Sequence, residues 1–276
     1  MYCNMNHMLQ AAEQANRGVG AFNIHCLEVV PAMIRAGANL HQPIILQVSV
    51  STAKYIGMKL LRMVTEQLAS ETETEVALHL DHASQLEDVY MALDAGFTSV
   101  MFDGSRLPLE ENIQLTAQAV AAALQVNASV EAELGIVGRG STPEVFPYTD
   151  PEAAEEFVNR TGVNALAVAI GTYHGQYKRK TDIRFDVLEQ IHKRVDIPLV
   201  LHGGTGVREE ELQRCIHLGM RKLNFGTELN VAFVRKGKEA FAAAEPDLSL
   251  RKIMDPCCEA VEEVVSRKIK LVGFNP

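Results

Sequence analysis

The stretch Ala165-Leu166-Ala167-Val168-Ala169-Ile170 is apolar throughout and has the length of one strand. A short apolar run without alternation is typical of a parallel strand that is covered on both faces. Seven further apolar or β-branched runs of strand length precede and follow it: Val19–Ile24, Pro43–Ser49, Val76–Leu80, Ser99–Phe102, Ser129–Glu133, Pro198–Leu201 and Lys222–Phe225. The sequence therefore predicts eight strands.

Amphipathic segments lie between these runs, and four of them show helical spacing clearly: Leu107–Gln125, Pro151–Arg160, Phe185–Arg194 and Glu209–Leu218. Eight strand–helix units with right-handed crossovers close most simply into a barrel. We therefore predict an α/β fold in which residues 1–276 form a single (β/α)₈ TIM barrel. Residues from about 246 to 276, which include the amphipathic run Val261–Val272, predict one or two extra helices outside the barrel.

Length and composition narrow the class of protein. A chain of 276 residues, 47% hydrophobic and 22% charged, fits one large barrel with a sizeable core. The net charge of −9 argues against a nucleic-acid partner. The apolar runs are too short to cross a bilayer, and the N-terminal residues lack the pattern of a secretory signal. The five cysteines show no C-x-x-C spacing. These features favour a cytoplasmic protein without a membrane partner.

Every predicted strand delivers a polar side chain to its carboxyl end. Active sites of such barrels lie at the mouth that these ends form. The residues, in chain order, are Asn23, Ser49, Asp81 with His82, Asp103, Glu133, His174, His202 and Asn224. Because folding alone does not require this convergence, the sequence predicts an active site there.

Three of these residues, His82, His174 and His202, follow or end separate strands and could meet one ion. Imidazole suits zinc, and three protein ligands with an open position are typical of catalytic zinc. A structural role remains an alternative for His79. We expect four other histidines, His7, His41, His192 and His217, to be surface or core residues.

Glycine-rich turns follow two of the predicted metal ligands and predict an anion site. Glycine allows close approach of the backbone to an anion, and a following helix offers free N–H groups. The residues concerned are Gly175, Gly203, Gly204, Thr205, Asn224, Phe225, Gly226 and Thr227. Their position near the seventh and eighth strands matches the usual phosphate position in TIM barrels.

Several carboxylates lie near the predicted metal ion, and the sequence allows more than one role for each of them. Asp81 precedes a metal ligand and could move a proton on a bound hydroxyl, or it could orient a histidine. Glu131 and Glu133 face the same side of one strand, so ion pairing inside the mouth is an alternative to function. Asp103 and Glu133 could also support the ligands or hold an alternate metal position.

The sequence resembles the class II, metal-dependent ketose-bisphosphate aldolase family, in its tagatose/fructose-bisphosphate branch. The segments that carry the resemblance span nearly the whole chain: Ala21–Ile24, Leu78–His82, Val130–Gly135, Ala167–Gly175, Pro198–Gly204 and Asn224–Glu228. The resemblance implies a carbon–carbon lyase of carbohydrate metabolism that binds zinc through His82, His174 and His202, with Asp81 as catalytic proton carrier. It implies a phosphorylated sugar substrate, a monovalent Na⁺ or K⁺ ion, and a homodimer or homotetramer.

The resemblance also assigns substrate contacts. It implies that the glycine-rich turns hold dihydroxyacetone phosphate, that Asn23 and Ser49 lie nearby, and that Arg251 reaches the other phosphate, sometimes across a subunit boundary. Glu144 corresponds loosely to the proton-shuttling glutamate of a mobile loop, which here reads Gly138–Glu144. Cys26 and the basic run Tyr177–Lys180 also depart from the family pattern. They leave open a related ketose 1-phosphate with another acidic tail.

Other functions fit parts of the pattern. A different metal-dependent barrel enzyme, such as a hydrolase, would keep the three histidines. A Schiff-base aldolase needs a buried lysine at a strand end, whereas Lys222 enters its strand from the start. A non-catalytic partner of an aldolase would be expected to lose metal ligands or the aspartate, and this chain keeps all four residues.

Overall fold

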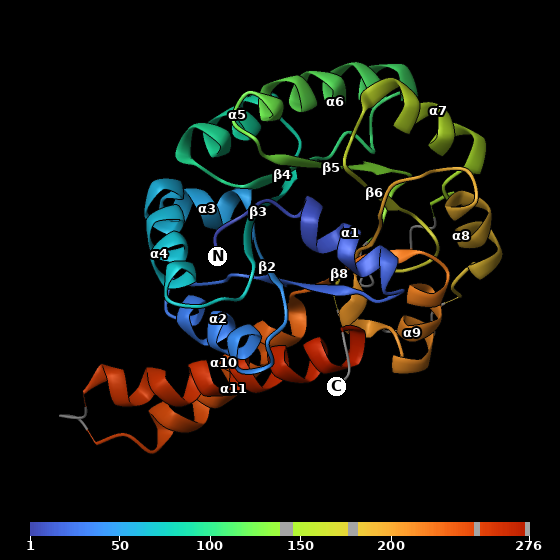
Figure 1. Ribbon diagram of the computed structural model, residues 1–276. Coiled ribbons are helices and arrows are strands. Elements are labelled where there is room, and N and C mark those ends of the chain that lie inside the picture. Colours follow the sequence, from blue (N-terminus) through green and yellow to red (C-terminus); the bar gives the residue numbers. More distant parts are fainter. Residues whose placement is uncertain (139–145, 176–181, 246–248, 274–276) are drawn as a thin grey trace.

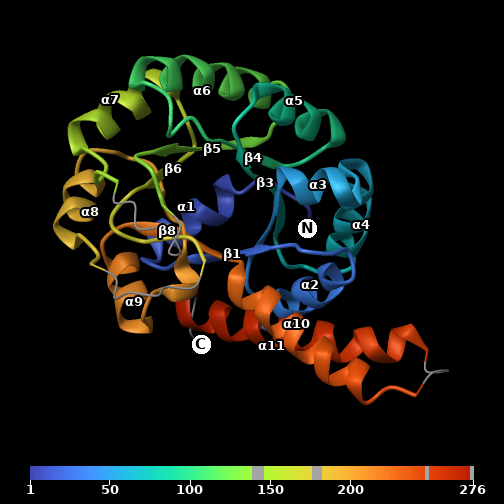
Figure 2. The ribbon, with the colours of Figure 1, turned by 180° about the vertical axis from the view of Figure 1, so that it is seen from behind.

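The computed structural model describes residues 1–138, 146–175, 182–245 and 249–273. Eight parallel strands form a closed barrel in chain order, with the last strand paired to the first. The strands are β1 Val19–Asn23, β2 Ile44–Ser49, β3 Val76–Ala83, β4 Ser99–Phe102, β5 Ser129–Leu134, β6 Ala165–Val168, β7 Leu199–Leu201 and β8 Met220–Phe225. The predicted (β/α)₈ TIM barrel is confirmed (Figures 1 and 2).

Helices surround the barrel and cover the outer faces of the strands (Figure 1). They are α2 Val29–Asn39, α3 Val50–Ile56, α4 Met58–Ser70, α5 Leu86–Ala95, α6 Leu109–Leu124, α7 Pro151–Thr161, α8 Phe185–His192 and α9 Glu209–His217. A short 3-10 turn, η1 Gly204–Gly206, follows β7 at the mouth. The start of α7 shows why the sequence specifies them. Pro151 takes the first position, and Asp150 accepts hydrogen bonds from the N–H groups of Glu152 and Ala153.

A short helix that the sequence analysis did not predict, α1 (Asn6–Gln14), lies across the end of the barrel opposite the mouth (Figure 1). Met5, Met8, Leu9 and Ala12 have helical spacing and pack against apolar side chains of the barrel interior, such as Ala21. This packing closes the lower end with an apolar layer. Ligands therefore approach from the mouth, where the polar strand ends lie.

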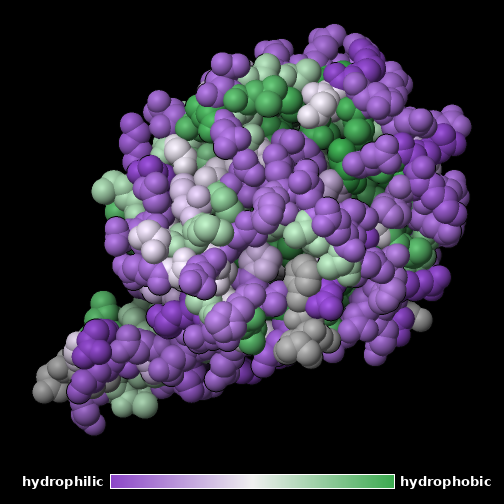
Figure 3. All heavy atoms as spheres, viewed as in Figure 1, coloured by the Kyte–Doolittle hydropathy of each residue, from purple (hydrophilic) through white to green (hydrophobic). Residues whose placement is uncertain are grey.

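The last two helices, α10 (Thr227–Ala242) and α11 (Leu250–Val272), lie side by side and form an arm that extends past the barrel (Figures 1 and 2). Helix α11 also packs against α2. Phe241 and Leu250, near the far end of the arm, expose 58% and 62% of their surface. Figure 3 shows apolar residues on this arm, while hydrophilic residues cover most of the face in view. Among the described helices, none has the length and apolar character needed to cross a membrane.

Candidate active site

Asp81 and His82 are neighbours on β3, and a regular strand would send them to opposite faces. The backbone of His82 has a φ of 53°, in the left-handed region, and the pairing of β3 with β4 shifts register at this point. This distortion places His82 Nε2 3.9 Å from Asp81 Oδ1. Strained backbone of this kind is found mainly at functional sites, where the surrounding structure holds it.

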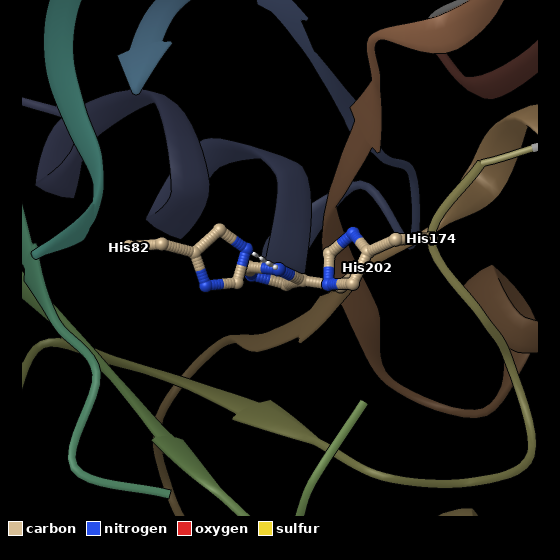
Figure 4. A group of neighbouring side chains, drawn as sticks. All are labelled: His82, His174 and His202. Atoms are coloured by element: carbon tan, nitrogen blue, oxygen red, sulfur yellow. Dashed lines mark hydrogen bonds between the residues drawn. The ribbon is translucent and has the colours of Figure 1, made fainter. Parts of the chain in front are cut away.

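Three imidazole rings meet at the mouth of the barrel (Figure 4). His82 comes from β3, His174 from the loop after β6 and His202 from the end of β7. The ring centroids are 4.6 to 5.5 Å apart, and each ring offers a nitrogen within 4.8 Å of the others. The structure thus brings together the three histidines that the sequence points to.

Carboxylates fix the orientation of two of these rings. Nδ1 of His82 lies 2.8 Å from Asp103 Oδ2, and Nε2 of His202 lies 2.8 Å from Glu131 Oε1. An ionised carboxylate only accepts hydrogen bonds, so each of these nitrogens carries the ring proton. The opposite nitrogens, His82 Nε2 and His202 Nδ1, then face each other 3.0 Å apart with lone pairs. Such a pair of acceptors requires a shared proton or a metal ion between them, and zinc suits these nitrogen ligands.

The charges around the rings also favour a cation. Burial alone lowers the pKa of His82, but the carboxylates of Asp81, Asp103 and Glu133 outweigh it and raise this pKa to about 10. Burial, and next the charge of Asp103, raises the pKa of Glu133 to about 8. The site therefore retains positive charge, whether as protons or as a metal ion.

Asp103 and Glu133 form a second group of potential ligands with His82, in which the offered atoms also lie within 4.8 Å of one another. Hydrogen bonds to His82 and Ser105 hold the pKa of Asp103 well below its usual range, although burial opposes them. Glu133 accepts a hydrogen bond from the N–H of Val137 at 3.2 Å. This geometry allows both roles considered from the sequence, support of His82 and an alternate metal position.

Asp81 is anchored through one carboxylate oxygen. Its Oδ2 accepts hydrogen bonds from Asn23 Nδ2 at 3.0 Å and from Gln47 Nε2 at 3.4 Å. Its Oδ1 has no hydrogen-bond partner in the described part of the chain. Burial alone raises the pKa of Asp81, but the nearby His82, His202 and Lys222 lower it overall. The result is an ionised carboxylate with one free oxygen next to the histidines, as a general base requires.

A cavity of about 270 Å³ opens beside the histidines. Its lining is Asn23, His25, Gln47, Asp81, His174, Gly175, Gly203, Thr205, Asn224, Gly226, Thr227 and Asn230. Gly175 and Gly203 have φ values of 89° and 76°, which residues with side chains rarely adopt. Thr227 begins the 16-residue helix α10, so free N–H groups lie at this wall. These features suit an anion such as phosphate.

Some residues proposed from the sequence lie outside this lining, within the described ranges. Ser49 caps α3 through a hydrogen bond from the Thr52 N–H at 3.4 Å, and Gly204 is buried beneath the wall. The Phe225 side chain stacks on Phe22 in the core between barrel and helices, with ring centroids 5.8 Å apart. The expectation that Phe225 binds substrate therefore applies at most to its backbone. Glu144 and the run Tyr177–Lys180 belong to the residues that the structure does not describe.

Arg251 does not approach the site of its own chain. It lies in the first turn of α11, at the far end of the arm, and its side chain is 73% exposed. Its nearest charged partner is Asp255, one turn along the same helix, at 3.1 Å. A contact between Arg251 and substrate is therefore ruled out within one chain and requires a second chain.

Sequence reasoning missed three residues that line the cavity: His25, Gln47 and Asn230. Gln47 had a detectable signal, because it is the one polar residue inside the apolar run Ile44–Val48 and shares a face with Ser49. Asn230 lies one helical turn after Thr227. His25 lies two residues after the end of β1, and its Nε2 lies 3.2 Å from the Gly226 carbonyl oxygen.

Comparisons with known proteins agree with this geometry. Residues 3–275 match the family described as class-II fructose-bisphosphate aldolase. A fructose-bisphosphate aldolase of Geobacillus stearothermophilus is 42% identical over 99% of this chain and 97% of its own length. A probable fructose-bisphosphate aldolase of Bacillus subtilis is 39% identical over 99% and 98%. The crystal structure of the YdjI aldolase from Escherichia coli K12 has a TM-score of 0.89, with 31% identity over 99% and 98% of the two chains.

The chain belongs to the class II fructose-bisphosphate aldolase family. It is therefore a lyase that performs aldol cleavage, and the resemblance found in the sequence is confirmed. Class II aldolases are generally metal-dependent, and the three histidines together with Asp103 and Glu133 offer this aldolase the side chains for a metal ion.

Proposed function

We propose that this aldolase cleaves a ketose 1-phosphate or 1,6-bisphosphate of the fructose or tagatose type into dihydroxyacetone phosphate and an aldehyde, with one zinc ion per chain. The main support is the pair of lone pairs, His82 Nε2 and His202 Nδ1, that face each other at 3.0 Å beside the free oxygen of Asp81. A ketose 1-phosphate with another acidic tail is the alternative substrate.

Asp81 is the residue that moves the proton. His82, His174 and His202 would hold a zinc ion, which when bound would supply Lewis-acid polarisation of the ketose carbonyl. Asp81 Oδ1 accepts the proton of the C4 hydroxyl, the C3–C4 bond breaks, and the aldehyde leaves with its new carbonyl. Asn23 and Gln47 keep Asp81 oriented through Oδ2 during this transfer. Glu144, from the loop, is our candidate for the acid that then protonates C3.

The phosphate of the dihydroxyacetone half is placed on the wall formed by Gly175, Gly203, Thr205, Asn224 and Thr227. Backbone N–H groups at the start of α10 and the Thr227 side chain favour negative charge there. We also propose a monovalent cation, Na⁺ or K⁺, next to this phosphate. Binding the phosphate at a fixed distance from the histidines places the carbonyl of the substrate toward the rings.

Further proposals concern assembly and location. Because Arg251 lies at the end of the arm, we propose a homodimer or homotetramer in which the arm of one chain reaches the substrate of another. A protein of this family without a described membrane-crossing helix fits the cytoplasm.

A direct test measures dihydroxyacetone phosphate release from a panel of ketose phosphates through a coupled, NADH-dependent reduction. We expect cleavage of fructose or tagatose bisphosphate, or of a ketose 1-phosphate, and loss of cleavage in His202→Ala. Zinc content is measured in the same samples by elemental analysis. Equal turnover in a fully metal-free sample would contradict the proposal.

A further inference from the structure

Lys222 lies in the interior of the barrel, below the cavity, and is fully buried. Its Nζ is 2.8 Å from Glu131 Oε2, 2.8 Å from Asn224 Oδ1 and 3.2 Å from Gln47 Oε1. An ammonium group has three N–H donors and no acceptor. Lys222 thus donates hydrogen bonds to Gln47 and Asn224 and forms an ion pair with Glu131, and each of these three residues leads toward the active site.

The contact with Gln47 fixes which way its amide points. Because Lys222 can only donate, the carbonyl oxygen of Gln47 must face it, and the NH₂ group must face the other way. On that side Gln47 Nε2 lies 2.9 Å from Asn23 Oδ1 and 3.4 Å from Asp81 Oδ2. The orientation that Lys222 imposes on Gln47 is thus the one that supports Asp81.

The contact with Glu131 fixes the other side of the site. Glu131 shares its two oxygens between Lys222 and His202, and its Oε1 accepts from His202 Nε2 at 2.8 Å. Asn224 Nδ2 also lies 3.3 Å from His202 Nε2, but the shorter contact to a charged acceptor is the stronger one. His79 Nε2, 3.6 Å from Glu131 Oε2, is the alternative partner for this carboxylate. Lys222 pairs with Oε2, the oxygen that also faces His79, and this leaves Oε1 to accept from His202.

We propose that Lys222 is a positioning residue that orients Glu131 and Gln47, and through them the metal-binding nitrogen of His202 and the carboxylate of Asp81. This inference rests on the proposed function of the site. Lys222 would then affect both the affinity for the metal ion, through His202, and the proton transfer, through Asp81. It would do so although it does not line the substrate cavity.

The test compares Lys222→Met with Arg221→Met. Arg221 is the adjacent residue of β8, is also buried, and pairs with a carboxylate, Glu13, at 2.8 Å. It points to the opposite side of the strand, so both variants lose a buried cation, and only one loses it beneath the site. Zinc affinity is measured at equilibrium by competition with a coloured chelator, without substrate. Thermal unfolding and the separate values of kcat and KM at saturating zinc complete the comparison.

We expect Lys222→Met to bind zinc about 10- to 100-fold more weakly, on the scale found when partners of metal ligands are removed. At saturating zinc its kcat falls while KM stays within about threefold, because Asp81 acts after substrate binds. Arg221→Met is expected to lower the unfolding temperature and leave zinc affinity within about twofold of wild type. Equal zinc affinity and equal kcat in Lys222→Met and wild type would overturn the inference.

Glu131→Gln provides a second route if Lys222→Met folds poorly. It removes the charge that Lys222 holds, so we expect it to weaken zinc binding. The double variant Glu131→Gln with Lys222→Gln should lose less binding free energy than the sum of the losses in the single variants Glu131→Gln and Lys222→Gln. Fully additive losses would overturn the link through Glu131. Wild-type protein that binds no zinc would instead overturn the proposed function, and this inference with it.

Discussion

His202 Nδ1 and His82 Nε2 lie 3.0 Å apart, each turned toward the other by a carboxylate on the far side of its ring. Asp103, directly after β4, holds one ring, and Glu131, on β5, holds the other. Both rings therefore have their metal-binding orientation fixed by contacts that do not involve the ion. Because the rings are already oriented, their side chains lose less conformational entropy when the metal binds, and the affinity for the metal is higher.

Metal removal follows directly from this relationship. Complete chelation should abolish cleavage and lower the unfolding temperature, because two lone pairs, or a lone pair and a trapped proton, then share a buried space. Zinc at 100 times its Kd should add about 2.7 kcal/mol to the free energy of unfolding. Calorimetry across a zinc titration measures this. An unfolding temperature that does not change with zinc concentration would contradict a site built from these rings.

The metal-free protein should lose stability as pH rises from about 6.5 to 10. The pKa of His82 is raised to about 10, chiefly by Asp81 and against the effect of burial. A group whose pKa is raised on folding contributes stability below its unfolded pKa and loses it as pH passes the folded one. Burial raises the pKa of Glu133 to about 8, which acts in the same direction. Urea midpoints with chelator present measure the slope, and His82→Asn should flatten it.

Much of this site could be predicted from the sequence, because the carboxyl ends of the strands of a parallel barrel meet at one mouth. Once eight runs predict eight parallel strands, residues such as His174 and His202 must share one mouth, however far apart they are along the chain. The phosphate wall follows from the same argument, since glycines at 175 and 203 permit φ values that other residues avoid.

Other parts depend on contacts that no local pattern specifies. Strand alternation alone would separate Asp81 from His82, and only the left-handed backbone at His82 turns both toward the mouth. The role of Lys222 arises from three partners on three other positions of the barrel, which are brought together by register. The side-chain direction of Phe225 was not readable from the sequence, because its neighbours Asn224 and Gly226 line the cavity while its own side chain faces the helices.

Asp81→Ala should keep the metal and lose cleavage. Removing a general acid–base group typically lowers the rate 10²- to 10⁴-fold, and Asp81 Oδ1 is the free oxygen next to the rings. Asp81→Asn is the matched control, because it retains the shape of the side chain without the proton-accepting charge. Both variants should contain zinc by elemental analysis and should show kcat reduced by at least about 100-fold. Loss of zinc in Asp81→Asn would identify Asp81 as a support of the metal instead.

Gly226→Ala should impair catalysis through Asn23. A Cβ at Gly226 would lie 2.6 Å from Asn23 Oδ1, so Asn23 must move and its 3.0 Å bond to Asp81 is disturbed. We expect kcat to fall about 10- to 100-fold, the scale for small misplacements of catalytic groups. Gly237→Ala, farther along α10, is the control, because its Cβ meets only Cys257 Sγ at 3.6 Å. That variant should keep full activity and gain up to about 1 kcal/mol of stability. Equal activity of the two variants would show that Asn23 does not orient Asp81.

Measurements of activity in Arg251 variants can test whether the arm of one chain contributes to the active site of another. Its place at the far end of the arm means that it can complete only the site of another chain. Arg251→Ala should therefore raise KM for a bisphosphate, while Arg160→Ala, which removes a surface arginine of α7 whose side chain is 40% exposed, should not. The Arg251→Ala chain keeps Asp81 but lacks the arginine of the arm, whereas the Asp81→Ala chain keeps the arginine but lacks the catalytic aspartate. A dimer of one chain of each kind therefore contains one complete site, with Asp81 from the first chain and Arg251 from the second.

Unfolding the two variants together and refolding them should restore activity to about a quarter of wild type if dimers form at random. Refolding each variant alone, followed by mixing, is the control and should restore none beyond the sum of the two. Because the arm must cross from one chain to the next, light scattering should find the active species at twice the mass of the chain or more. Activity that never exceeds that sum after joint refolding would place Arg251 outside the substrate site.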